Sequence, residues 1–323
     1  DQPRSRGLGD VYKRQILYFI IISFILFVLL EHTTGNPAIQ YLHEHGVAQI
    51  TDERIKMAQD KLGLSQALPI RYLQWLGHAF TGDLGTSFSN GEPVTDRIAK
   101  AVAPTLKLIF ISAIILFPLG YIIGYLCGNY PKKKWSIFIL RASQVVTSLP
   151  EYWLAIIFIY YFGVKWHLLP FVGSYSFEYF ILPIAILVLV EGSHMVLLSS
   201  HLFERTLRNE AYQLASLRQF KLKDRIYVQV KDILAPLLTI TINNFIRLFS
   251  RVIILEVIFS ISGLGKLLII SINLRDYPLI LGILMMMITI IMILNFLGDI
   301  LLEKSDPRLN MSKTLGGRVT YED

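Results

Sequence analysis

The sequence has little charge and almost no cysteine. Only 17% of its 323 residues are Asp, Glu, Lys or Arg, whereas soluble domains carry nearer a quarter. Hydrophobic residues make up 53%, and the charge deficit is concentrated in apolar blocks long enough to cross a bilayer, roughly 20 residues per helix. The single cysteine, Cys127, excludes an intramolecular disulfide.

The sequence also lacks the motifs of nucleotide binding and metal-dependent catalysis. Gly265-Lys266 is similar to the end of a phosphate loop, but Ser260 occupies the place of the required glycine and no Ser or Thr follows. There is no HExxH among the scattered histidines, and no paired catalytic groups support an intramembrane enzyme. We therefore predict no catalytic residue, metal or cofactor on this chain, and any ATP must be bound by a separate chain.

Six apolar blocks predict an all-α integral membrane protein with about six transmembrane helices. They are 16–30, 104–127, 139–162, 179–199, 233–259 and 279–302. The first, at 15 residues or roughly 22 Å of helix, is short of the bilayer core. The third contains Pro150, which a membrane helix tolerates where neighbours satisfy the freed carbonyl.

The blocks also predict the organisation of the chain. Residues 1–15 lack an initiator methionine and are expected to be a truncated or non-native start. Residues 16–31 would form the first span, 32–103 an external segment, 104–305 the membrane core and 306–323 a cytoplasmic tail. A signal peptide also fits the start, but no small-x-small cleavage site follows directly.

Charge in the loops predicts the topology. The net charge of +7 is concentrated after the second and fourth spans and in the tail, whereas residues 32–103 hold six Lys/Arg against seven Asp/Glu. A positive-inside bias explains this pattern better than nucleic-acid binding, and it places both termini in the cytoplasm.

Two groups of polar residues lie inside predicted spans. Asn243, Arg247 and Arg251 share one helix face because they are four residues apart, with Asn244 beside them. Glu191 and His194 lie in the fourth span. Intramembrane ionisable groups indicate a functional site by default, such as the lining of a water-filled path; the alternative is packing between helices or against a second subunit.

Ordered motifs from about residue 35 to 310 resemble one family. The C-terminal ones are Glu256, Phe259, Gly263, Gly265, Arg275, Asp276, Tyr277, Pro278, Asn295, Asp299, Asp306, Pro307 and Arg308. The external ones lie at 62–64, 69–76, 82–87 and 93–94, and another lies at 148–153. The chain resembles the membrane permease of the oligopeptide, dipeptide and nickel branch of ATP-binding-cassette (ABC) importers.

The resemblance implies a fold, partners and a coupling segment. The fold would be that of type I ABC importer permeases. The partners would be a second homologous permease, two ATP-binding subunits, an extracytoplasmic solute-binding protein and the lipid bilayer, with no nucleic acid. Coupling would lie at about 203–225, through Glu210, Ala211, Tyr212 and Ala215, although the glycine expected about eight residues further on is absent.

The resemblance leaves the cargo open. Peptides, nickel and metal chelates are all carried by this branch, and the run Met285 to Met287 cannot form one metal site because adjacent helical residues point in different directions. The alternative function is a stand-alone secondary transporter. Such proteins often contain internal repeats, and none is detected between the two halves of this sequence.

Overall fold

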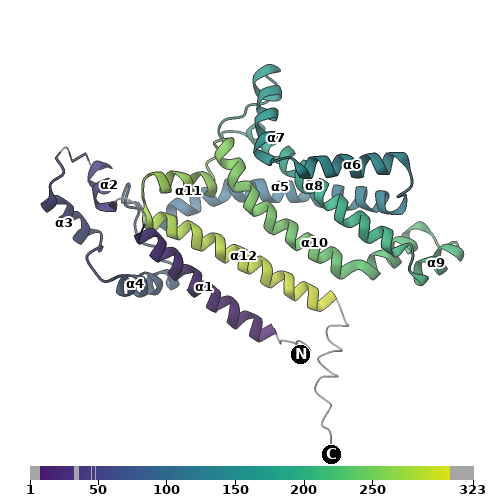
Figure 1. Cartoon of the computed structure of the whole chain (residues 1–323), viewed down its shortest axis with the longest axis horizontal. Helices are drawn as coiled ribbons and strands as arrows, with labels where there is room; N and C mark the ends of the chain where they lie inside the picture. Colours follow the sequence, from purple (N-terminus) through teal and green to yellow (C-terminus); the bar gives the residue numbers. More distant parts are fainter. Residues whose placement is uncertain (1–7, 33–35, 45, 48, 306–323) are drawn as a thin grey trace, which may run out of the picture. The chain divides into compact units, whose positions relative to one another are not determined.

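The computed structural model describes residues 8–32, 36–44, 46–47 and 49–305, and these are almost entirely helical (Figure 1). Their one β feature is an isolated bridge between Thr86 and Pro93. The helices are α1 (Leu8–Glu31), α2 (Pro37–Glu44), α3 (Asp52–Lys61), α4 (Leu68–Phe80), α5 (Val94–Asn129), α6 (Lys134–Ser148), α7 (Glu151–Phe158), the π-helix η1 (Ile159–Lys165), α8 (Glu178–Thr206), α9 (Glu210–Leu217), α10 (Leu222–Ile258), α11 (Leu264–Asn273) and α12 (Tyr277–Ser305).

The helices account for the predicted membrane fold. Four of them, α5, α8, α10 and α12, are long and apolar enough to cross a bilayer. The pair α6 and α7–η1 adds a bent fifth, and the apolar part of α1, Gln15–Leu30, is shorter. The prediction of an all-α membrane protein with about six spans is therefore confirmed in outline.

The third span is broken, contrary to the prediction of one span from 139 to 162. α6 ends at Ser148, α7 begins at Glu151, and the two directions differ by 99°. Pro150 lacks an N–H and clashes with the preceding turn of a continuing helix. Leu149 accordingly takes the extended backbone, φ −86° and ψ 136°, that proline favours in the residue before it.

Other boundaries also differ from the prediction. α1 begins at Leu8, inside the segment predicted to be truncated or non-native. α8 continues to Thr206, so that Glu191 lies near the middle of its helix. α10 begins at Leu222 and bends at Ile233, three residues before Pro236. The tail 306–323 lies outside the described residues.

The structure divides into two compact units, the first made of Asp1–Thr105 and Ser262–Met292. Its core is formed by the start of α5, α11 and the start of α12, through Val94, Ile98, Ala101, Leu264, Leu279 and Ile283. Gly282 permits close contact, because a Cβ there would lie 2.7 Å from Val94 Cγ1. Met286 and Met287 pack against this core, consistent with ordinary apolar filling.

The first unit also holds the segment predicted to be external, which is largely helical. α2 and α3 share a small core of Ala38, Leu42 and Ala58. α4 contacts α1, where the Tyr72 and Ser23 hydroxyls lie 2.8 Å apart and the Tyr72 ring packs edge-on against Phe24. These contacts give the segment a defined structure.

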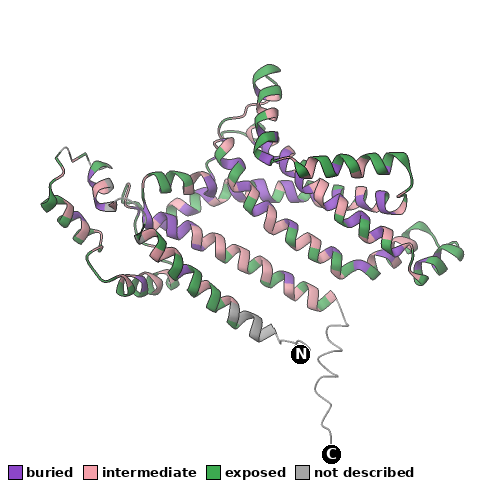
Figure 2. Cartoon of the chain, viewed as in Figure 1, coloured by how far each residue is buried: buried purple, intermediate pink, exposed green. Residues whose placement is uncertain are grey.

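The second unit, Leu106–Ile261 and Ile293–Asp323, is built around α8. This helix packs against α6 and α10 and is the most buried of the four candidate spans (Figure 2). It also lies close to α5 at Gly120, Gly124 and Gly128, where a Cβ on Gly124 would stand 1.9 Å from Ser199 Oγ. Small residues spaced by four allow the backbones of membrane helices to approach, and here they bring α5 against the helix that carries Glu191.

Candidate functional site

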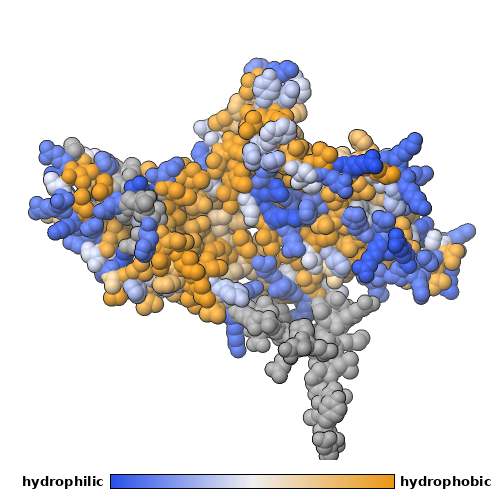
Figure 3. All heavy atoms as spheres, viewed as in Figure 1, coloured by the Kyte–Doolittle hydropathy of each residue, from blue (hydrophilic) through white to orange (hydrophobic). Residues whose placement is uncertain are grey.

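α10 exposes a polar face that does not suit lipid. It is the least apolar of the four candidate spans. Thr239, Asn243 and Ser250 are exposed, and their spacings of four and seven place them on one side of the helix. Figure 3 shows hydrophilic atoms interrupting the apolar surface along α10. Because polar groups facing hydrocarbon are unfavourable, this side of α10 should meet water or another protein.

Two arginines lie at the edge of this face and reach inward to α8. Arg251 Nε lies 2.5 Å from Glu191 Oε1, and Arg247 Nε lies 3.2 Å from Glu191 Oε2. The Glu191 side chain is 1% exposed, whereas Arg247 is 35% and Arg251 32% exposed. A buried carboxylate is thus neutralised by two guanidiniums that remain in partial contact with the exterior.

A second carboxylate, which sequence reasoning missed, completes the cluster. Arg251 Nη1 donates to Glu151 Oε2 at 2.6 Å, and Glu151 is 9% exposed. Glu151 lies in the first turn of α7 directly after Pro150, so the break in the third span positions it. A charged residue beside an intramembrane proline was the available signal. With two carboxylates and two guanidiniums, the charges balance.

The remaining predicted residues of this cluster take different places. Asn244 is fully buried and accepts a hydrogen bond from Arg247 Nη2. The ring nitrogens of His194 lie 2.7 and 3.1 Å from Arg247 Nη2 and Nη1. Asn243 is exposed and takes no part in these contacts. The structure therefore brings Glu191, His194, Asn244, Arg247 and Arg251 together and leaves Asn243 on the open face. We name the five with Glu151 the α10 cluster.

The predicted coupling residues lie on and beside a short helix. α9 begins at Glu210 and is capped by Asn209, whose side chain accepts from the Ala211 N–H at 3.1 Å. Glu210 and Ala211 are exposed, whereas Tyr212 and Ala215 are buried. The Tyr212 hydroxyl accepts from Arg225 Nη2 at 2.7 Å, which ties α9 to the start of α10.

The glycine missing from the predicted coupling segment has a structural counterpart. α9 ends in a Schellman motif, in which Phe220 N–H donates to Ala215 O and Gln219 N–H to Ser216 O. Gln219 takes the left-handed conformation at φ +53° that this motif requires. The glycine geometry is thus kept without the glycine. Leu214 and Leu217, 55% and 79% exposed, leave an apolar patch on α9.

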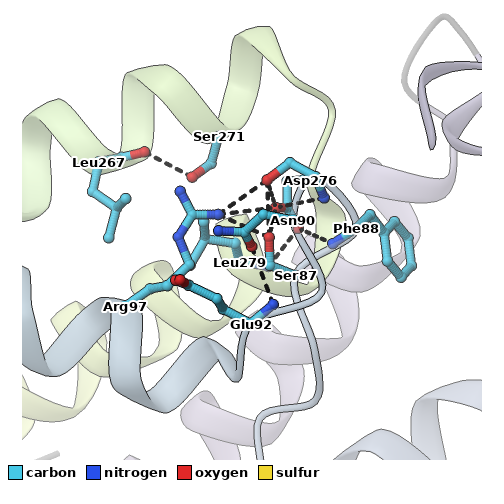
Figure 4. A network of polar contacts seen from close by, with 10 residues as sticks. Ser87, Phe88, Asn90, Glu92, Arg97, Leu267, Ser271, Asp276 and Leu279 are labelled. Atoms are coloured by element: carbon cyan, nitrogen blue, oxygen red, sulfur yellow. Dashed lines mark hydrogen bonds and ion pairs between the residues drawn. The ribbon is translucent and has the colours of Figure 1, made fainter. Parts of the chain in front are cut away.

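A different polar network surrounds Asp276 in the first unit (Figure 4). Asp276 is fully buried and accepts hydrogen bonds from the Ser87 hydroxyl, the Ser89 hydroxyl at 3.0 Å and the Phe88 N–H at 3.0 Å. Arg97 Nη1 lies 3.5 Å from its carboxylate. Asp276 also precedes α12 and caps it, with the Leu279 N–H 3.4 Å away. This network joins the loop before α5 to the start of α12.

The other predicted motif residues occupy helix ends and packing positions. Glu256 and Phe259 are buried at the end of α10, and Gly263 and Gly265 are buried at the start of α11. Arg275 is exposed with φ +54°, and Tyr277 and Pro278 form the first turn of α12. Asn295 and Asp299 are half-buried on α12. Asp306, Pro307 and Arg308 lie outside the described residues.

Comparison with known proteins identifies the family. Residues 120–311 match the family described as binding-protein-dependent transport system inner membrane component. The chain is 31% identical over 306 residues, 93% of its length and 97% of the relative's, to the metal-staphylopine import system permease protein CntB of Staphylococcus aureus (strain NCTC 8325 / PS 47). It is 30% identical over 303 residues, 91% of its length and 89% of the relative's, to the nickel import system permease protein NikB of Staphylococcus aureus (strain USA300).

This family places the chain in the cytoplasmic membrane, as a transporter subunit that works with a separate ATPase and a binding protein. The resemblance inferred from the motifs is confirmed, and the family supports an importer over a stand-alone secondary transporter. The chain belongs to the inner-membrane components of binding-protein-dependent transport systems and is a permease subunit of an ABC importer.

Proposed function

We propose that this permease forms half of a solute pathway with a second, homologous permease subunit, and that the exposed face of α10 lines that pathway. The observation that carries the proposal is the α10 cluster, in which buried carboxylates hold Arg247 and Arg251 at the edge of an exposed polar face. Such a face suits a water-filled path between subunits and not a lipid contact.

Thiol labelling tests the pathway. The natural Cys127 is buried, so a Cys127→Ala background is suitable. Ser250→Cys places a thiol on the exposed face of α10, and a charged thiol reagent should then block uptake, with cargo giving protection. Asp83→Cys, at a side chain that is 63% exposed in the segment before α5, is the control that should react without this protection. If the reagent leaves uptake through the Ser250→Cys importer unchanged, the face does not line the pathway.

We propose further that α9 transmits ATP-driven motion from two ATP-binding subunits. A short capped helix with exposed Leu214 and Leu217 fits a partner's apolar groove, and its link through Tyr212 to Arg225 of α10 would carry the movement. Leu217→Asp should therefore release the ATPase during purification or abolish cargo-stimulated hydrolysis. Gln213→Asp, on the same helix, controls for added charge.

We propose that the cargo is a metal complex or nickel, with peptides as the alternative. The support is that two relatives at about 30% identity are named for metal-staphylopine and nickel import. An extracytoplasmic solute-binding protein would deliver the cargo. Calorimetric titration of that protein with nickel, nickel–histidine and trialanine tests this: binding of trialanine alone would shift the proposal to peptides.

We propose that both termini are cytoplasmic. The support is the positive charge at Lys132 to Lys134 and beyond α8. A cysteine at Asp83 should be labelled in intact spheroplasts, and one at Lys133 only after lysis. The reverse pattern would invert the topology.

We also propose that the chain carries no cofactor. The purified permease should then contain no stoichiometric metal by elemental analysis.

A further inference from the structure

One guanidinium of the α10 cluster retains an unused donor. Arg247 has a partner near each of its three nitrogens: Nε forms an ion pair with Glu191, Nη1 lies near His194, and Nη2 lies near His194 and donates to Asn244. Arg251 engages Nε with Glu191 and Nη1 with Glu151. Within the described part of the chain, no residue makes a hydrogen bond or ion pair to Arg251 Nη2. Arg251 is therefore the member of the cluster that can bind another group.

Exposure sets the order in which a solute would meet these charges. Glu191 and Glu151 are 1% and 9% exposed, whereas Arg251 is 32% exposed. The cluster is neutral as a whole, but its carboxylates lie behind and its guanidinium lies toward the open face. A group approaching along that face meets N–H donors first.

We infer that Arg251 is a contact point for a carboxylate of the solute that passes along α10; this rests on the proposed pathway. A guanidinium matches a carboxylate in charge and planar geometry. Glu151 already shares this guanidinium, so the added contact is weakened and the solute can leave, as transport requires. A bare divalent cation would be repelled at short range.

The solute class that fits is therefore a small molecule with a free carboxylate. A metal held by a carboxylate-bearing chelator satisfies this chemistry, and so does a peptide with a free C-terminus. The two sources share one chemical group, so each can be tested against a matched compound in which that group is an amide.

The test measures protection of a thiol beside Arg251. The permease with Cys127→Ala and Ser250→Cys, its partner permease and both ATPase subunits are placed in lipid nanodiscs without the binding protein, whose own specificity is thereby removed. A charged thiol reagent is applied with rising concentrations of nickel–histidine or nickel–histidinamide, and of trialanine or trialaninamide. In at least one pair, the carboxylate compound should protect at about tenfold lower concentration than its amide.

Three variants test whether Arg251 causes the preference for the carboxylate compound over its amide, measured as the ratio of the two protecting concentrations. Arg251→Lys, which keeps the charge but loses the planar fork, should reduce the ratio to about one. Glu151→Gln, which removes the competing carboxylate, should increase the ratio severalfold, a gain that a misfolded protein cannot produce. Arg141→Lys, at an exposed arginine of α6, should leave the ratio unchanged.

The outcomes separate this inference from the proposed pathway. Equal protection by acid and amide in the parent protein, or a ratio that survives Arg251→Lys, overturns the carboxylate contact while leaving the pathway supported. If none of the four compounds protects the thiol and the reagent does not change uptake, both the carboxylate contact and the proposed pathway are overturned.

Discussion

Two buried carboxylates in this permease are neutralised in different ways. Asp276 accepts hydrogen bonds from two hydroxyls and two backbone N–H groups of residues 87–89, and its guanidinium partner Arg97 is only 15% exposed. Glu191 receives two guanidiniums, and both are about a third exposed. The first carboxylate is enclosed on all sides, whereas the second holds charged groups at a boundary with the exterior.

We interpret this difference as that between a structural contact and the proposed transport surface. A carboxylate satisfied by neutral donors, a helix N-terminus and a largely buried guanidinium stabilises one backbone arrangement. A carboxylate satisfied by half-exposed arginines leaves donors available to something that arrives from outside. We therefore expect substitutions at Asp276 to act on folding and those at Glu191 to act chiefly on uptake.

Asp276→Ala should have the largest effect. It leaves the Ser87 and Ser89 hydroxyls and the Phe88 N–H without their shared acceptor in a buried site, deprives Arg97 of its ion-pair partner, and removes the cap of α12. Losing one partner of a buried charge pair costs about 3 to 5 kcal/mol, so the variant should be degraded or aggregated. Membrane abundance and thermal unfolding in detergent measure this.

Asp83→Ala is the matched control, because that side chain is 63% exposed and caps a turn at Gly85. It should lower stability by less than about 1 kcal/mol. Equal losses for the two variants would show that enclosure of Asp276 is not the source of the effect.

Glu191→Ala should reduce uptake more than it reduces stability. Arg247 and Arg251 can rehydrate where they are exposed, so stability should fall by only about 2 kcal/mol. Uptake should fall at least tenfold at equal protein abundance, because both guanidiniums lose the group that positions them. Normal uptake, or disappearance of the protein as in Asp276→Ala, would contradict the comparison.

Sequence patterns could predict the exposed face but not its inner partners. Spacing alone placed Asn243, Arg247 and Arg251 on one side of α10. It could not decide how the helix is rotated, which is why Asn244 is the buried asparagine and Asn243 the open one. Glu151 was missed because its partner lies 100 residues away and because a proline in a span is compatible with either a straight or a broken helix.

The same limit applies to helix boundaries and end geometry. Apolar runs predicted the spans because burial in lipid depends on composition, whereas α1 and α8 extend into polar sequence where hydropathy carries no signal. The absence of the glycine from the predicted coupling segment did not indicate that Gln219 would adopt the left-handed conformation, because hydrogen bonds at the end of α9 determine that backbone.

Gly124→Ala tests whether the Glu191 arrangement depends on helix packing. The added Cβ would stand 1.9 Å from Ser199 Oγ, so α5 and α8 must separate, at a cost of about 1 to 2 kcal/mol. Uptake should fall with stability, because α8 carries Glu191, and Ser199→Gly should restore both. Gly192→Ala is the control: its nearest neighbour, Leu116 Cδ1, would be 3.9 Å away. A Gly124→Ala protein with normal stability would refute this packing argument.

The smallest effect should come from a matched pair of glycine substitutions at helix ends. Gln219 and Arg275 occupy the same position of a Schellman motif, at φ +53° and +54°, where a side chain is strained and glycine is not. Gln219→Gly and Arg275→Gly should each raise stability by roughly 0.5 kcal/mol, because the relief of strain is partly offset by greater freedom of the unfolded chain.

The two substitutions should differ in their effect on transport. Arg275 directly precedes Asp276, whose contacts already hold that backbone, so Arg275→Gly should leave uptake unchanged. Gln219 lies at the end of α9, in a turn that is closed by the helix-end hydrogen bonds to Ser216 and Ala215. A change in cargo-stimulated ATP hydrolysis in Gln219→Gly would indicate that the end of α9 moves during transport. Destabilisation by either substitution would mean that the side chain contributes more than its backbone conformation costs.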